Sequence, residues 1–417
     1  MRIILVLMAA LLLIAGCQVE TNPSDNNSTN PISVSENQVS AKHVANGNND
    51  FGIKLFSDLS KKEGNIFISP YSIYSAFGMV YEGASGDTKN QMNSVLWYEM
   101  LVGDVLVYPS DRDRRDGFYT LSNNFNLSKN TTLSTANALW IQNDYKILDS
   151  YSQLTSSVYK ARAYNVDFMQ KENARLKING WTEDNTNGKI KDLIPTGSLR
   201  ADSRLVLTNA VYFNSSWKMK FEKRDTQDKD FTTGSGSKVK VPMMRQTSKF
   251  GYMEDSNVQI LEMPYIDDKL SMVLILPKGD LSLAKLDLQK VKESESKLEN
   301  QKVNVFVPRF KFTSKFELSS QLKSMGMTEA FSDNADFSAM TGNKDLKIGF
   351  VIHQAYVDVN EEGTEAAAAT AIGMTVTSMP VNNPIPTFMA DKPFIFMIKD
   401  KSSGTILFIG KVNNPKE

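Results

Sequence analysis

Cysteine and histidine are almost absent from this chain of 417 residues, which has one cysteine, Cys17, and two histidines, His43 and His353. One cysteine allows no intramolecular disulfide and no thiolate metal cluster, and two histidines leave little material for metal or triad chemistry. An excess of one charge is also missing, because 47 Lys and Arg balance 47 Asp and Glu. The neutral balance gives no reason to expect nucleic acid or an anionic membrane surface as the main partner.

No apolar run reaches the roughly 20 residues that a membrane-spanning helix needs. The run from Ile3 to Ile14 follows a single positive charge and is typical of the apolar region of a secretory signal. It ends in small residues directly before Cys17, an arrangement that resembles the lipobox of prokaryotic lipoproteins. We therefore expect residues 1–16 to be a signal peptide and Cys17 to be lipidated, which would anchor the protein to the outer face of a membrane. An ordinary signal followed by a chance cysteine is the alternative.

The next segment, residues 17–48, is rich in Asn and Ser, has few apolar residues and shows no period. Such a composition predicts a flexible tether with no core of its own, in which His43 would be solvated. The folded body is then predicted to span 49–417, with no low-complexity break.

The pattern of the folded body predicts a mixed α+β fold, with helices first and strands later. Helical spacing covers 50–60, and Ser69 followed by proline is a typical start for a helix that runs to Gly83. Residues 101–130 look irregular, and the mixed charges of 111–116 favour a solvated loop. Apolar runs predict strands at 205–213, 271–276, 303–307, 394–398 and 406–409.

Two polar residues lie inside apolar runs. Asn209 is within a predicted buried strand, where an amide without partners costs about 1–3 kcal/mol, so we expect it to have specific partners. His353 follows Phe-Val-Ile and taken alone is best interpreted as a satisfied core histidine. The sequence has no nucleophile elbow, phosphate loop, dinucleotide fingerprint or zinc-protease motif, so we expect no enzyme activity and no cofactor.

The segment from Val359 to Pro386 does not suit an ordinary globular fold. An Ala-rich helix is one interpretation, but the residues after Ala369 favour a strand. With period two, one face carries only small or apolar uncharged residues from Thr364 to Val376, and no proline occurs before Pro380. The segment could thus be an exposed loop and also a strand slotted into a sheet.

The body contains an ordered set of motifs: NIFISPYSI (65–73), TNGKIKDLI (186–194), RLVLTNAVYF (204–213), VPMM (241–244), LEMPY (261–265), SMVLILPKG (271–279), VPRFKF (307–312), LKSMGMTEAF (322–331), ADF (335–337), VNEEGTEAAAAT (359–370) and ADKPFIF (390–396). Through these motifs the sequence resembles the serpin family, over nearly the whole body. The resemblance implies a single large α+β domain with three sheets, about nine helices and a mobile reactive-centre loop.

The resemblance also implies residue roles. Ser69, Ser72, Asn209 and His353 match the shutter, a polar cluster beneath the strands that open in the central sheet. Trp217 matches the tryptophan of the breach, where the loop first enters the sheet, although Asn214-Ser215-Ser216 departs from the family pattern before it. Ten residues match the hinge of the reactive-centre loop: Glu361, Glu362, Gly363, Thr364, Glu365, Ala366, Ala367, Ala368, Ala369 and Thr370.

The function implied is suicide inhibition of serine proteases. In inhibitory serpins the protease cuts the loop and forms a covalent acyl-enzyme, and the cleaved loop then inserts as a new strand that distorts the attached protease. A hinge of small, uncharged residues suits that role. A non-inhibitory serpin that acts as a binding, carrier or chaperone protein is the alternative. In either case we expect a monomer, with no nucleic-acid partner and no membrane contact beyond the lipid anchor.

The scissile bond is predicted from the hinge. In inhibitory members the stretch from the hinge glutamate to the residue before the cut typically spans seventeen residues, counted inclusively, and a stretch of seventeen that begins at Glu361 ends at Thr377. The loop is about five residues longer than usual, and its prolines favour placing the extra length after the cut. We therefore expect cleavage at Thr377–Ser378, with Val376–Thr377 and Ser378–Met379 as alternatives, by an elastase-like or subtilisin-like protease rather than a trypsin-like one.

Overall fold

A mixed sheet in the middle of the molecule positions the candidate site. The computed structural model describes residues 34–96, 100–102, 105–107, 109–124, 131–278, 293–364 and 384–417. The predicted α+β class is confirmed. The α-helices in this part of the chain are α1 (Val34–Leu59), α2 (Pro70–Gly83), α3 (Gly86–Leu96), α4 (Asp111–Asn124), α5 (Asp149–Val158), α6 (Lys171–Asn185), α8 (Ser319–Ser324) and α9 (Ser338–Thr341).

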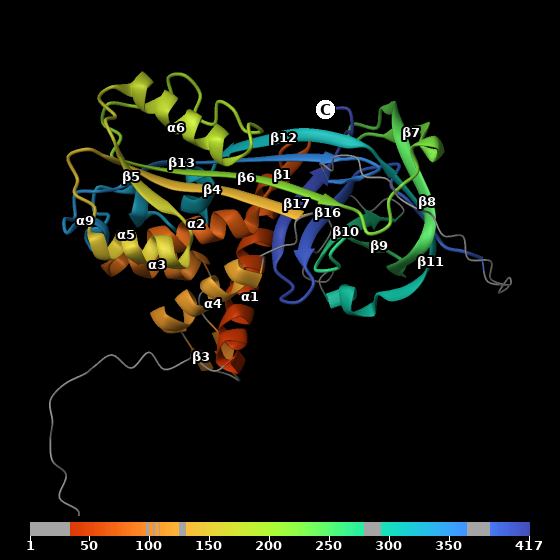
Figure 1. Ribbon diagram of the computed structural model, residues 1–417, viewed down its shortest axis with the longest axis horizontal. Helices are drawn as coiled ribbons and strands as arrows, with labels where there is room; N and C mark the ends of the chain where they lie inside the picture. Colours follow the sequence, from red (N-terminus) through yellow and green to blue (C-terminus); the bar gives the residue numbers. More distant parts are fainter. Residues whose placement is uncertain are drawn as a thin grey trace, which may run out of the picture.

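The central sheet has the strand order β12-β13-β14-β6-β4-β5. Helix α6 covers one face of this sheet, while α2, α3 and α5 lie on the other (Figure 1). Its strands are β4 (Thr131–Gln142), β5 (Arg162–Val166), β6 (Leu205–Ser216), β12 (Phe310–Glu317), β13 (Ile348–Val359) and β14 (Gly363–Thr364).

The second sheet has nine strands. Its longest strand, β8, pairs with β7 through residues 238–243, with β11 through residues 243–252 and with β9 through residues 251–254. The strands are β1 (Ile66–Ile68), β7 (Gln227–Thr232), β8 (Lys238–Glu254), β9 (Val258–Pro264), β10 (Leu270–Pro277), β11 (Glu299–Pro308), β15 (Thr387–Met389), β16 (Phe394–Asp400) and β17 (Ile406–Val412), and a separate hairpin joins β2 (Met100–Val102) to β3 (Val105–Val107).

The five predicted strands and the helix after Ser69 are all present in the structure. The Ser69 side chain accepts a hydrogen bond from the backbone N–H of Ser72, and Pro70 occupies the first turn of α2, as the sequence predicted. The strand predicted at 205–213 extends to Ser216, and every residue from Leu205 to Phe213 is buried. That burial explains why the whole run is apolar or hydrogen-bonded.

Helix α1 begins earlier than the sequence predicted. The sequence predicts that 34–48 belongs to the flexible tether, but this segment is helical, and Ala41, Val44 and Ala45 already pack in the core. Asn48 donates to the carbonyl of Ile406 at 3.0 Å and Asn49 donates to that of Gly404 at 2.8 Å. These asparagines therefore act as anchors to a distant strand, and the predicted boundary at residue 48 is wrong.

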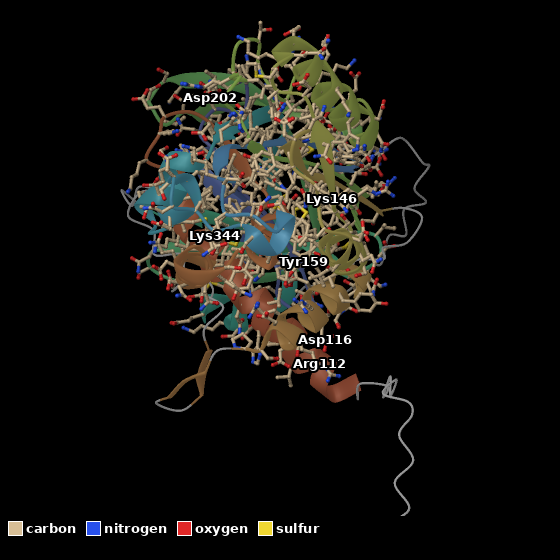
Figure 2. All side chains as sticks on the ribbon, turned by 90° about the vertical axis from the view of Figure 1, so that its left-hand side faces the viewer. Arg112, Asp116, Lys146, Tyr159, Asp202 and Lys344 are labelled. Carbon is tan, nitrogen blue, oxygen red and sulfur yellow. The ribbon has the colours of Figure 1, made fainter. Side chains whose placement is uncertain are left out.

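The charged run at 111–116 is also helical, which corrects the expected solvated loop. It forms the first turns of α4, where Arg112 and Asp116 pair at the surface (Figure 2). Arg114 is instead buried, with its guanidinium carbon 4.4 Å from the ring centroid of Tyr81 and an ion pair to Asp111. A cation on an aromatic face and beside a carboxylate can be buried at little cost.

Helices α1 and α4 approach each other closely at Gly117, where a Cβ atom would lie 2.5 Å from the carbonyl oxygen of Ser40. His43 of α1 lies in this packed region and is only partly exposed, so the expectation of a solvated histidine is wrong. Burial lowers the pKa of His43, and the opposing charge of Asp113 offsets part of that shift.

No helix in the described part of the chain is long and apolar enough to cross a membrane. No group of three or more His, Cys, Asp or Glu side chains in the same part of the chain could hold a metal ion.

Candidate functional site

The candidate site is the seam between β6 and β13, the two central strands of the six-stranded sheet. They pair in parallel from Ile348 opposite Leu205 to Tyr356 opposite Tyr212. Beyond Tyr356 the strands part, and the short strand β14 lies between them, antiparallel to both. After β13 the chain therefore turns back and re-enters the sheet as β14, between β13 and β6.

A tight turn brings the hinge back into the sheet. The N–H of Asn360 donates to the carbonyl of Gly363 at 2.9 Å, and the N–H of Glu362 donates to the Asn360 side chain at 3.0 Å. At Gly363 a Cβ atom would lie 2.1 Å from the carbonyl oxygen of Ser215. Only glycine allows the backbone to approach β6 this closely.

Thr364 is the last described residue of the hinge, and it is 1% exposed. Its hydroxyl lies 2.7 Å from the hydroxyl of Tyr265. Trp217, also 1% exposed, stacks on Tyr265 with ring centroids 4.7 Å apart. The Trp217 indole N–H donates to the carbonyl of Asn360 at 2.9 Å, and its backbone N–H donates to that of Glu362 at 2.9 Å. The predicted breach tryptophan thus holds the turn directly.

Glu361 carries a buried charge at the entrance to the seam. Its side chain is 2% exposed, whereas that of its ion-pair partner Arg309 is 43% exposed. The Arg309 Nε lies 2.8 Å from both carboxylate oxygens, and the Thr226 hydroxyl donates to the same carboxylate at 2.6 Å. Burial by itself would raise the pKa of Glu361, but the hydrogen bonds from Arg309 and Thr226 outweigh it and leave the pKa below its ordinary value.

Glu362 forms ion pairs with two lysines. Its carboxylate lies 2.8 Å from the ammonium of Lys220 and 3.6 Å from that of Lys223. The hydrogen bond from Lys220 is the main reason that the pKa of Glu362 is lowered, against a smaller effect of burial. Both hinge glutamates are therefore ionised and fixed, which holds the start of the loop in one place.

The four predicted shutter residues meet further down the seam. The backbone N–H of Ser69 donates to Nε2 of His353 at 3.2 Å, and Nδ1 of His353 contacts the Asn209 side-chain oxygen. The Asn209 amide donates to the Ser72 hydroxyl at 2.7 Å. All four residues are at most 1% exposed, and the partners that Asn209 was predicted to need are present.

His353 is neutral in this cluster. Complete burial lowers its pKa to about 3, although the contact with Asn209 works in the opposite direction. Because Nε2 accepts a hydrogen bond from Ser69, the ring proton belongs on Nδ1, facing the Asn209 oxygen. The histidine thus joins β13 to β6 and to the start of α2.

Sequence reasoning missed several members of both clusters. Asn137 of β4 lies opposite Asn209 and accepts from the Ser72 hydroxyl at 3.0 Å, so it completes the shutter. At the breach, Tyr265 and Arg309 had no assigned role. Asn137 could have been found by the signal that singled out Asn209, namely an amide within an apolar strand.

Several predicted residues lie outside the described part of the chain. They are the rest of the hinge (Glu365, Ala366, Ala367, Ala368, Ala369 and Thr370), the scissile-bond candidates (Val376, Thr377, Ser378 and Met379) and the lipidation candidate Cys17.

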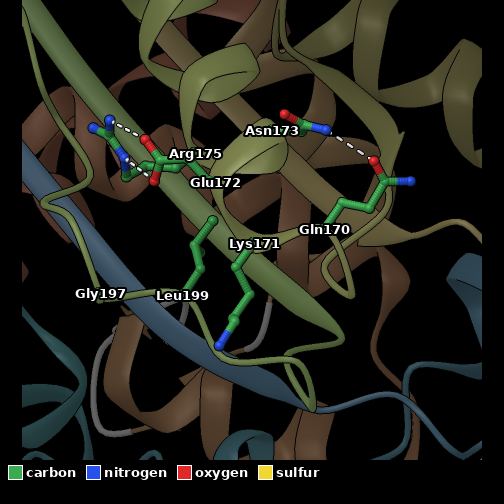
Figure 3. A pocket seen from close by; sticks show the side chains of 7 residues that line it. All are labelled: Gln170, Lys171, Glu172, Asn173, Arg175, Gly197 and Leu199. Atoms are coloured by element: carbon green, nitrogen blue, oxygen red, sulfur yellow. Dashed lines mark hydrogen bonds and ion pairs between the residues drawn. The ribbon is translucent and has the colours of Figure 1, made fainter.

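A cavity of about 450 Å³ lies at the start of α6 and is separate from the seam. Its lining is polar and largely paired within itself, because Arg175 binds Glu172 through two hydrogen bonds and Asn173 donates to Gln170 (Figure 3). The remaining lining residues are Lys171, Gly197 and Leu199. No residue of the breach or the shutter takes part in it.

Comparisons with known proteins agree with this geometry. Residues 46–415 match the family described as Serpin (serine protease inhibitor). The chain is 39% identical over 380 residues to a serpin-like protein of Methanosarcina acetivorans, covering 89% of this chain and 86% of that protein. It is 37% identical over 390 residues to the leukocyte elastase inhibitor of Bos taurus, covering 90% of this chain and all of that protein.

Solved structures give the same result. The thermophilic serpin tengpin, in its native state, superposes with a TM-score of 0.78 at 28% identity, covering 95% of this chain and 97% of tengpin. Human thyroxine-binding globulin superposes with a TM-score of 0.80 at 29% identity, covering 92% of this chain and all of the globulin. The chain belongs to the serpin family. Members of this family are mostly protease inhibitors, and some are non-inhibitory carriers.

The ion pair at the breach generates a prediction. Arg309→Met keeps the apolar stem of the side chain but leaves the buried Glu361 carboxylate without its main partner, which should lower the free energy of unfolding by about 3 kcal/mol. Lys311→Met, two residues further along in β12, is the matched control, since the exposed pair of Lys311 with Asp358 at 3.5 Å should contribute less than about 1 kcal/mol. Denaturant unfolding of the uncleaved proteins measures both, and equal effects would contradict the assigned role of Glu361.

Proposed function

We propose that this serpin inhibits serine proteases by conformational trapping. The observation that carries the proposal is the position of β14, because the first hinge residues already lie between the two strands that must separate. The cleaved loop would continue from there as a full strand, and the protease attached to it as an acyl-enzyme would be carried along and distorted. The uncleaved protein is then metastable, and inhibition is kinetic.

The register of β14 supports this continuation. Gly363 pairs with Ser216 and Thr364 pairs with both Ser215 and Val359. If the same antiparallel register continues, Thr370 becomes level with Asn209 on one side and with His353 on the other. An inserting strand would therefore have to part the His353–Asn209 contact and would bring a hydroxyl to the polar groups that it separates.

The buried face of that strand would suit the core. Thr364 contacts Tyr265, so the alternation of a strand directs the side chains at positions 366, 368, 370 and 372 to the same side. These are Ala, Ala, Thr and Ile, which carry no charge. A non-inhibitory carrier, like thyroxine-binding globulin among the similar structures, remains the alternative that the experiments below distinguish.

The proposed cut is at Thr377–Ser378, with the neighbouring bonds on either side of it as alternatives. Small, uncharged residues at these positions suit a shallow, apolar specificity pocket rather than one with a buried carboxylate. The proposed targets are therefore elastase-like or subtilisin-like proteases. The similarity to the bovine leukocyte elastase inhibitor is in line with the first of these.

We also propose that Cys17 is lipidated and anchors the folded domain to the outer face of a membrane. The support is in the sequence: the only cysteine directly follows an apolar run that ends in small residues. An inhibitor held there would meet proteases that reach the cell surface.

The insertion step predicts the effect of Thr364→Arg. An arginine at this 1% exposed position would place an unpaired charge beneath the sheet, at a cost of several kcal/mol, so β14 should leave the seam in the uncleaved variant. Its re-entry after cleavage would then bear that cost, so insertion slows and hydrolysis of the acyl-enzyme prevails. The variant should be cleaved as a substrate, whereas Thr364→Ser, which keeps the hydroxyl that faces Tyr265, should still trap protease. Denaturing electrophoresis separates covalent complex from cleaved inhibitor. Equal trapping by the arginine variant and the wild type would rule out insertion at this register.

Incubation with a panel of serine proteases tests the target class. Elastase-like or subtilisin-like enzymes should form complexes that resist denaturant, and the mass of the released fragment should place the cut after Thr377. Trypsin should form little complex, because Lys392 is the first Lys or Arg after Glu361. Rapid trapping of trypsin would refute the proposed specificity, and cleavage without any complex would favour the carrier alternative.

Anchoring is tested by Cys17→Ser in the native host. The wild type should fractionate with membranes, while the serine variant, which cannot carry the lipid, should appear in the soluble fraction. A Ser→Ala change elsewhere in residues 18–33, such as Ser24→Ala, is the control and should leave the wild type's distribution unchanged. Equal partitioning of Cys17→Ser and wild type would overturn the anchor.

A further inference from the structure

Basic residues gather on one face of the second sheet, where β8 pairs with β11. Arg245 of β8 is opposite Phe306 of β11, and Lys249 is opposite Lys302. The alternation of a strand places these four side chains on the same face. Arg245, Lys249 and Lys302 are exposed, and Phe306 is partly exposed. The two strands lie at the end of the molecule that is opposite α5 and α9 (Figure 1).

A fourth cation reaches this face from β7. The ammonium of Lys229 lies 5.6 Å from the ring centroid of Phe306, and the guanidinium carbon of Arg245 lies at the same distance from that centroid. The aromatic ring thus keeps two positive charges near each other. Like charges directly opposite each other in a sheet are destabilising, so the placement of Lys249 opposite Lys302 does not serve the stability of the sheet. We call these four cations and the Phe306 ring the basic face.

Acidic residues lie elsewhere on the same strands. The register directs no Asp or Glu of β7, β8, β11 or β15 to the basic face. Asp230 of β7 is opposite Lys240 of β8 on the other side of the sheet, and the two form an ion pair at 3.0 Å. The first carboxylate in line with the basic face belongs to Glu262 of β9, beside Gly251. The basic face therefore presents charge of one sign to a partner.

The basic face adjoins the chain that follows the predicted cut. β15 pairs in parallel with β11, with Thr387 opposite Asn304 and Met389 opposite Phe306. Ser378, the residue after the predicted cut, precedes Thr387 by nine residues, so their Cα atoms are at most about 30 Å apart. A protease domain of about 250 residues is roughly 45 Å across. A protease that holds this bond can therefore touch the basic face.

We propose that the basic face is a docking surface for an acidic surface of the target protease, used while the protease holds the uncleaved loop. The inference rests on the proposed trapping function and deepens it, because it adds the surface charge of the target to the predicted specificity. Opposite charges steer two proteins toward each other and raise their association rate, and salt screens this effect. In the proposed trapping the protease then leaves with the inserting strand, so the contact acts on the encounter and not on the trapped complex.

The test compares Lys249→Glu with Lys238→Glu in the full chain. Both variants change the net charge equally and both residues are exposed in β8, but Lys238 is directed to the other side of the sheet. The probes are two subtilisin-like proteases that cut the same bond, one with a negative and one with a positive net charge at neutral pH. With the acidic protease, Lys249→Glu should form complex about 3- to 10-fold more slowly than the wild type at low salt, and at the same rate in about 1 M salt.

Three further results are expected. Lys238→Glu should stay within about twofold of the wild type. Lys249→Gln, which removes one charge without reversing it, should show a smaller decrease than Lys249→Glu. The number of inhibitor molecules consumed for each protease trapped should be the same in all of these proteins, because the contact is lost before trapping is complete.

Equal slowing by Lys249→Glu and Lys238→Glu would overturn the inference, because net charge alone would then explain the effect. Equal slowing of Lys249→Glu with the acidic and the basic protease would overturn it as well, and so would a decrease that persists in about 1 M salt.

The readouts also separate this inference from the proposed function. If the wild type is cleaved but traps no protease, trapping is wrong, but kcat/KM for cleavage of the loop can still be compared among the variants. A lower kcat/KM of the acidic protease for Lys249→Glu than for Lys238→Glu would support the basic face even then, and equal values would refute it.

Discussion

The parallel contact between β6 and β13 is the interaction on which the rest of the structure depends. Below it, His353 and Asn209 join the two strands through a buried polar contact that has no exposure to water. Above it, β14 keeps the same strands apart. The two strands are therefore paired directly at one level and separated by β14 at the next.

The turn that leads into β14 is fixed by charge as well as by packing. Glu361 and Glu362 each have a cationic partner, and Trp217 binds the backbone of the same turn through two hydrogen bonds. Small residues follow directly after these glutamates in the sequence. The turn fixes the position at which the strand begins. The small residues after it can then form the strand itself.

Sequence patterns predicted the strands of the core well, because burial on both faces leaves an uninterrupted apolar run such as 205–213. They also indicated that Asn209 needs partners, although not that Asn137 would be one of them. The patterns gave wrong predictions where a tertiary contact gives a residue a role that the local sequence does not indicate. Asn48 looks like part of a tether until its contact with Ile406 is known, and Arg114 looks solvated until Tyr81 covers it. Such pairings join residues that are distant in the chain, so no local period reveals them.

The pre-placed strand β14 has a consequence for the order of events. Forming a new strand from a free loop has a nucleation cost, because the ends must first meet in the correct register. Here two residues are already paired, and Thr364 is already buried. In the proposed trapping, insertion would then lengthen a strand from one end, in a register that is set before cleavage. Only the rate of this lengthening would compete with hydrolysis of the acyl-enzyme.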